Sequence, residues 1–179
     1  ADLALTIFDA MRKPAGLKDR DRLLLNISVQ LHHCGKFITI SKAPECNYNI
    51  IMSTEIIGIS HLEREIIANV VRYNIRDFDY NMVRMEADPE LSSGSLPDQS
   101  DATILTAELT AMLRLANSMD RSHGQKLRDC RISVKEKTLT VSTEYPGDIT
   151  LEAVSFEQKA AFFEEIFGIR PVLKQKRRV

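Results

Sequence analysis

Two adjacent histidines, His32 and His33, follow the apolar residues of a helix predicted over about residues 19–34. A hydrolytic metal site needs nitrogen and oxygen ligands from different helices, with carboxylates that offset the charge of the ion. Asp120 could supply such a carboxylate, because it ends another predicted helix, over about residues 101–119. His33 adds little, because neighbouring residues on a helix point about 100° apart. His32 and Asp120 alone do not hold a divalent ion tightly.

We therefore predict a degenerate metal site made of His32, His33 and Asp120, with no metal bound. A buried carboxylate needs a hydrogen-bond donor, so His32 and Asp120 are expected to form a buried pair between two helices. Solvent exposure of one or both side chains is an alternative, and a working catalytic metal site is another.

Basic residues near these positions could bind a phosphate-bearing anion. Lys36 follows the Gly35 turn and could act as a point charge, although an exposed loop lysine is the plainer interpretation. Arg72 and Arg76 are one helical turn apart, so they share a face and could grip successive phosphates. Alternatively, Arg72 pairs with Asp79 or a neighbouring acid. Two further candidates flank Asp120: Arg114 and Arg121. For these two, an ion pair in the helical core is the alternative to an anion groove.

Other catalytic chemistries find no support, since the sequence has no glycine-rich phosphate loop and no nucleophile with a convincing base. Cys34 is expected to be a small core residue of its helix. The odd number of widely spaced cysteines argues against disulfides and for a reducing compartment; they are Cys34, Cys46 and Cys130. His61 and His123 are expected to be exposed. We predict no catalytic residue, no metal and no cofactor in this segment.

Mostly helical elements must position these residues. The chain has 179 residues, of which 44% are hydrophobic and 27% charged, as in ordinary globular proteins. Its net charge of −1 gives no overall attraction to nucleic acid or anionic membranes. No apolar run approaches the roughly 20 residues that span a bilayer. The sequence predicts a first helix stopped by Pro14 and Gly16, and a second helix ended by Gly35. A loop over 36–45, closed by Pro44, precedes a third helix over 47–57, which Gly58 ends. A capping box from Ser60 to Glu63 opens a fourth helix, and an exposed loop follows over 88–100.

The pattern changes after about residue 124, where alternating polar and apolar residues predict strands. We expect a hairpin of 131–135 and 138–142, with its turn at Glu136-Lys137, and a short strand over 149–151. A helix opened by a capping box at Ser155 and ended by Gly168 follows, and then an edge strand over 169–173. The fold class is therefore mainly α: a helical domain over residues 1–124 followed by a small α+β subdomain over 125–179, with a sheet of two to four strands and one helix. The basic end from Lys174 to Arg178 is either a solvated terminus or a polyanion contact.

Four blocks of the sequence occur in an order that points to a family: Leu31–Ile38, Tyr48–Met52, Glu63–Asn74 and Leu113–Ser122. They resemble the C-terminal HD-like domain of the exopolyphosphatase and guanosine pentaphosphate phosphatase (Ppx/GppA) family. The resemblance places His32 on the histidine of an HD motif, whereas His33 replaces the metal-bridging aspartate. It places Cys46 or Asn47 where relatives have a loop histidine, and Asn74 where many have another. The early histidine of the motif would fall before Ala1, so we expect a segment of a longer protein.

The resemblance implies an accessory role. It implies that an N-terminal actin-like ATPase-fold domain hydrolyses polyphosphate or guanosine pentaphosphate. That domain is the expected partner of this chain, and Mg²⁺ is a possible cofactor of the parent enzyme. We expect this chain to be cytoplasmic, to bind polyphosphate or another phosphate polyanion, and to help form a homodimer, with no membrane and no specific nucleic acid as partner. The alternatives are an autonomous HD-type nucleotide phosphohydrolase and a purely structural or regulatory module.

Overall fold

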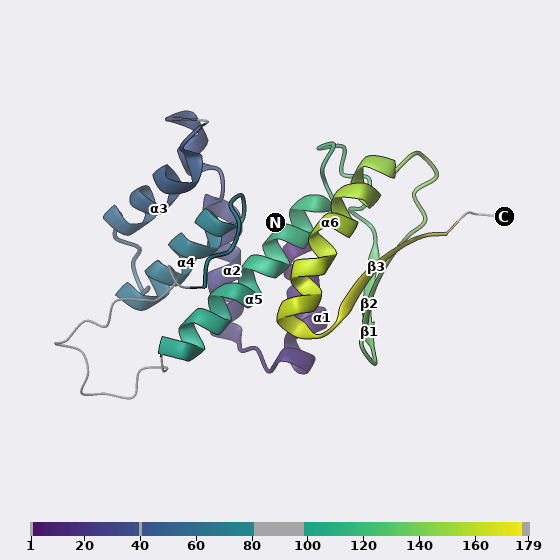
Figure 1. Cartoon of the computed structure of the whole chain (residues 1–179), viewed down its shortest axis with the longest axis horizontal. Coiled ribbons are helices and arrows are strands. Elements are labelled where there is room, and N and C mark those ends of the chain that lie inside the picture. The colour runs from purple at the N-terminus through teal and green to yellow at the C-terminus, as the bar shows by residue number, and fades with distance from the viewer. Residues whose placement is uncertain (1, 40, 81–98, 177–179) are drawn as a thin grey trace. The chain divides into compact units, whose positions relative to one another are not determined.

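The computed structural model describes residues 2–39, 41–80 and 99–176 (Figure 1). The described part holds six α-helices and a three-stranded sheet, which confirms the predicted mainly α fold class. The chain divides into two compact units, which we call the helical unit, Leu23–Thr110, and the sheet unit, Ala1–Arg22 with Ala111–Val179. The predicted boundary between residues 124 and 125 stays a prediction. Helix α1 groups with the sheet unit because it packs on the first strand.

The helical unit is built from α2 (Asp19–Leu31), a 3₁₀ turn η1 (Cys34–Phe37), α3 (Ala43–Ser53), α4 (His61–Tyr73) and the first part of α5 (Gln99–Ser118). Helices α3 and α4 lie side by side, as Figure 1 shows. The buried apolar residues of α4 supply much of the core of this unit. Seven consecutive positions of α4, 65–71, are buried, so this helix is enclosed on all sides rather than along one stripe. The other buried apolar side chains of the unit include Leu24, Leu25, Val29, Ile51 and Leu109.

Sequence patterns located α4 well and α3 poorly. The predicted capping box is confirmed, since Ser60 Oγ accepts a hydrogen bond from the Glu63 N–H, and the Glu63 carboxylate accepts one from the Ser60 N–H. The helix predicted over 47–57 forms, but its bounds are wrong, because α3 runs from Ala43 to Ser53. Pro44 lies in its first turn, where the missing N–H has no helical acceptor to lose, so proline opens this helix rather than closing a loop.

The end of α2 also differs from the prediction. The helix ends at Leu31, and Gly35, expected to be its stop, lies inside the 3₁₀ turn η1. Cys34 is therefore a half-buried residue of η1 rather than a core residue of α2. The first helix, α1, runs from Asp2 to Ala15, so Pro14 lies within its last turn. Gly16 follows this helix with a left-handed φ of 69°. The predicted loop over 88–100 lies almost entirely outside the described residues.

The sheet unit contains α1, the second part of α5, β1 (Arg131–Lys135), β2 (Thr138–Thr143), α6 (Thr150–Phe167) and β3 (Arg170–Gln175). The strand order is β1-β2-β3, with β1 antiparallel and β3 parallel to β2. Figure 1 shows α6 beside β3. One sheet face carries the buried residues of β2 and β3, which include Leu139, Val141 and Pro171. The predicted hairpin is confirmed, with Glu136 at a φ of 53° in its turn.

Of the predictions after β2, the short strand and the capping box are wrong, and the helix stop at Gly168 and the edge strand are confirmed. The short strand over 149–151 does not form, because α6 begins at Thr150, where the Asp148 carboxylate accepts the Thr150 N–H at 2.9 Å. The capping box at Ser155 consequently falls inside α6. The expected edge strand is confirmed as β3, and Arg170 and Lys176 direct their N–H groups to β2. Because alternate residues point to opposite sides of a strand, the nitrogen of Pro171 faces away from β2.

Candidate functional site

The predicted histidine pair lies just after α2. His32 is half-buried and its Nδ1 donates to the Val29 carbonyl oxygen at 2.5 Å, while His33 is exposed. The two rings stack with centroids 3.7 Å apart, so the expected divergence of about 100° is wrong, because α2 has already ended. Burial lowers the pKa of His32 below its ordinary value. His32 is therefore a neutral donor to its own helix end at neutral pH.

The side chain of Asn47 holds the turn that carries these histidines. Asn47 is fully buried in α3, and its Oδ1 accepts the Gly35 N–H at 2.5 Å and the Cys34 thiol at 3.4 Å. Its Nδ2 donates to the His32 carbonyl at 3.4 Å. A Cβ on Gly35 would lie 2.6 Å from Asn47 Oδ1, so only glycine permits this close approach. Sequence reasoning noted Asn47 only as a position where relatives have a histidine, and missed this structural role.

Asp120 is half-buried in the sheet unit, just beyond α5, and its Oδ1 accepts the Gln125 N–H at 2.8 Å. His32 and Asp120 thus each have a local hydrogen-bond partner, and the predicted pair between them stays a prediction, as does the degenerate site with His33. In the parts of the chain that the structure describes, no three His, Cys, Asp or Glu side chains gather closely enough to hold a metal ion. Lys36 is exposed in η1.

The two arginines of α4 and its exit, Arg72 and Arg76, converge on Glu45 in the first turn of α3. Arg76 Nη1 lies 2.6 Å from Glu45 Oε1, and Arg72 Nη2 lies 3.5 Å from the same oxygen. The partner of Arg72 is thus a neighbouring acid, Glu45, rather than Asp79. Burial would raise the pKa of Glu45, but the hydrogen bond from Arg76 and both positive charges hold it below its usual value. The carboxylate is therefore ionised at neutral pH.

Arg72 is held in place by aromatic rings. Its guanidinium lies 5.2 Å from the centre of the Tyr48 ring and 5.6 Å from that of Tyr73, within the range of a cation–π contact. Only 15% of the Arg72 side chain is exposed, compared with 47% of Arg76 and 44% of Glu45. Arg72 Nε is buried with no hydrogen-bond partner in the described part of the chain. The hydrogen-bonding capacity of this guanidinium is therefore only partly used.

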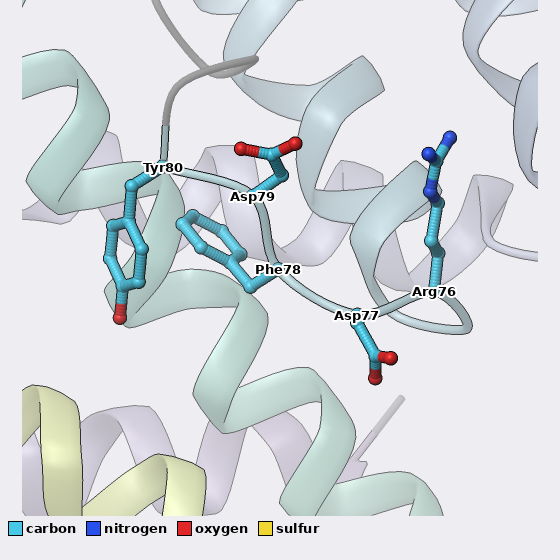
Figure 2. A pocket seen from close by; sticks show the side chains of 5 residues that line it. All are labelled: Arg76, Asp77, Phe78, Asp79 and Tyr80. Carbon is cyan, nitrogen blue, oxygen red and sulfur yellow. The ribbon is translucent and has the colours of Figure 1, made fainter.

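A shallow hollow of about 460 Å³ begins at Arg76 and follows the segment to Tyr80 (Figure 2). Its other lining residues are Asp77, Phe78 and Asp79. The Phe78 and Tyr80 rings meet edge to face at 4.9 Å, and Figure 2 shows them together at the end of the segment away from Arg76. Two aspartates outweigh one arginine here, so the charge of this hollow suits an anion less well than the Glu45 side of Arg76 does.

The remaining basic candidates lie in the sheet unit. Arg114 is buried, and its guanidinium stacks 4.6 Å from the centre of the Phe162 ring on α6. It thus packs within the core of this unit rather than lining a groove. Arg121 is exposed in the turn after α5, and the predicted exposure of His61 and His123 is confirmed.

A buried carboxylate that no sequence pattern marked contacts the turn after α5. Glu152 of α6 is fully buried and accepts hydrogen bonds from the Ser122 N–H at 3.1 Å, the Ser122 hydroxyl, and Lys126 Nζ at 3.2 Å. Burial would raise the pKa of Glu152, but these hydrogen bonds outweigh it and the pKa lies below its usual value. This charged group fastens the turn after α5 to the start of α6. Its partners are 26 and 30 residues away, so no local signal reveals it.

These elements can be set against known families. A family model for domain III of Ppx/GppA phosphatases matches residues 1–160. The chain belongs to the Ppx/GppA phosphatase family. The match confirms the resemblance and covers the whole helical unit, α1, the hairpin and the first part of α6 of this Ppx/GppA domain III. A domain III implies a parent chain with other domains. No curated protein matches the chain. Within the described residues of this Ppx/GppA domain, no helix is long and apolar enough to cross a membrane.

Proposed function

We propose that this domain is an accessory module of a Ppx/GppA phosphohydrolase that binds a phosphate chain through Arg72 and Arg76. The observation that carries the proposal is the convergence of both guanidinium groups on one anionic oxygen, Glu45 Oε1. A phosphate oxygen is an acceptor of the same kind, and arginine binds phosphate and carboxylate through the same planar array of donors. The pair is thus already arranged around an anion.

Chain length gives such a site its affinity. A condensed phosphate carries about one negative charge per unit, so weak contacts with successive groups add up and depend strongly on salt. Lys36, exposed in the same unit, is a further candidate contact. On this proposal the hydrolysis itself, and any Mg²⁺ that it needs, belong to another domain of the parent chain. Homodimer formation is a second part of the proposal, to be measured by sedimentation.

The alternatives differ in what they require. An autonomous HD-type phosphohydrolase needs a carboxylate where His33 stands, and the rings of His32 and His33 stack on each other rather than spreading around an ion. A purely structural module needs no anion affinity at all. Binding of polyphosphate to the intact protein therefore separates the accessory proposal from a purely structural one.

The test is the double variant Arg72→Ala with Arg76→Ala in the intact protein. Loss of two charge-assisted contacts is expected to weaken polyphosphate binding by about tenfold at low salt and to flatten its salt dependence. The charge-matched control replaces two exposed arginines of the sheet unit, Arg128 and Arg131, with alanine. Arg76→Ala alone, at the more exposed position, serves if the double variant unfolds. Affinity and salt dependence equal to those of the control would refute the proposal.

A further inference from the structure

We infer that Glu45 is a built-in counter-anion of the arginine pair and that a phosphate group binds by taking its place. This inference rests on the proposed function, because it concerns the same two arginines. It adds a residue that limits affinity. Neither arginine is an empty site in this structure, since both already face the Glu45 carboxylate.

The first step in the argument is that Glu45 satisfies the pair unevenly. Its Oε1 lies at hydrogen-bonding distance from Arg76, 2.6 Å, but 3.5 Å from Arg72, which is longer than a good charge-assisted bond. Arg72 Nε, buried nearby, has no partner within the described residues. One carboxylate oxygen therefore serves two cations and leaves the less mobile of them under-satisfied.

The second step concerns what would move. Arg72 is 15% exposed and packed against the Tyr48 and Tyr73 rings, whereas Glu45 is 44% exposed in the first turn of α3. A half-exposed glutamate loses little when it turns into solvent, because exposed ion pairs contribute only about 0–1 kcal/mol. When Glu45 leaves, Arg72 keeps its aromatic contacts and its position. Arg72 thus stays in position to bind an incoming anion.

The third step concerns which ligand fits. A terminal phosphoryl group offers three oxygens around one centre, so it can place separate oxygens on Arg72 and Arg76, which the single Glu45 oxygen cannot do. Both arginines contact one carboxylate oxygen, so together they hold one phosphoryl group of a bound chain, and neighbouring groups of that chain contact other basic residues. The pair thus suits a phosphoryl group better than it suits Glu45 in its present position.

The test is Glu45→Gln in the intact protein, with long-chain inorganic polyphosphate and orthophosphate as separate probes. Removal of the competing charge is expected to tighten polyphosphate binding about three- to fivefold, the value of an exposed ion pair. Glu55→Gln, an equal charge change at an exposed position of the same unit, is expected to change it far less. The gain must vanish when Arg72 and Arg76 are also replaced with alanine. Glu45→Asp, which keeps the charge but shortens the side chain, is expected to give part of the gain.

The outcomes separate the two proposals. If the arginine double variant binds polyphosphate as tightly as its control, the proposed function and this inference both fail. If the double variant binds weakly but Glu45→Gln binds no more tightly than Glu55→Gln, the proposed function stands and Glu45 is only a structural link between α3 and α4. Thermal unfolding of Glu45→Gln reports that structural link separately, and a loss of stability without a gain in affinity overturns the inference.

Discussion

Asn47 reaches across from α3 to the backbone of Gly35, whose N–H donates to Asn47 Oδ1 at 2.5 Å. The contact fastens the turn that carries His32 and His33 to the helix packed beside it. A fully buried polar side chain is stable only when its donors and acceptors are matched. Three residues of the turn match Asn47: its Oδ1 accepts from the Cys34 thiol and the Gly35 N–H, and its Nδ2 donates to the His32 carbonyl.

Gly35→Ala is expected to destabilise the protein by about 2 kcal/mol, because the added Cβ would lie 2.6 Å from Asn47 Oδ1 and 2.9 Å from the Asn47 backbone nitrogen. The helix backbone cannot yield as a flexible side chain can. Urea unfolding gives the change in free energy. Gly124→Ala is the control, since its nearest neighbours are the side chains of Ser122 and Lys126 at 3.3 Å or more. Equal stability of the two variants would contradict the close approach.

Glu152→Gln is expected to cost about 1–3 kcal/mol at pH 7, because Lys126 loses its buried anionic partner. The pKa of Glu152 is lowered in the folded protein, so the carboxylate contributes stability that is fully present above its ordinary value of 4.5. That contribution is lost as the pH falls through the lower, folded value. Between pH 7 and pH 3 the free energy of unfolding should therefore fall less in the variant than in the wild type. Parallel curves of this free energy against pH would argue against an ionised, buried Glu152.

His32 is expected to titrate below its ordinary value of 6.5, because burial disfavours its charged form. Its neutral form contributes stability above pH 6.5, and this contribution is lost as the pH falls through the folded pKa. The ring proton signals of the four histidines in an NMR titration measure this directly. A His32 midpoint at or above 6.5 would be incompatible with a half-buried, neutral ring.

Cys130 is expected to be slow to react with thiol reagents, because burial raises its pKa to about 11. The thiolate is the reactive form, so alkylation at pH 8 should be slow and should accelerate about tenfold per pH unit up to that value. Mass spectrometry of iodoacetamide-treated protein identifies the modified cysteine. Alkylation of Cys130 at pH 8 as fast as that of a free cysteine would show that the thiol is more accessible than its half-buried place just before β1 indicates.

The sequence predicted several caps, turns and helix stops that depend on residues close together in the chain. The capping box at Ser60, the hairpin around Glu136 and the stop at Gly168 are all signals within four or five residues, and all three are confirmed. Proline was one source of error, since Pro44 can close a loop or open a helix. Two other local signals also failed, the stop at Gly35 and the capping box at Ser155.

The candidate site was predictable as residue types but not as contacts. Spacing predicted that Arg72 and Arg76 share a helix face, but α4 ends at Tyr73, and their shared partner Glu45 comes from another helix, about 30 residues earlier. The stacking of His32 on His33 depended on where α2 ends, a boundary that moves by a few residues with tertiary contacts. Partners that lie far apart in the chain leave no periodic pattern to read.

The position of Pro171 has a consequence for how this protein meets copies of itself. Its nitrogen lies on the side of β3 away from β2, which is where an incoming strand would seek a donor. Such a strand would lack one backbone hydrogen-bond donor at Pro171 and would meet the positive charge of Lys174 three residues later. Both features discourage edge-to-edge aggregation. The imino acid thus protects this small sheet from unwanted growth without weakening its pairing with β2.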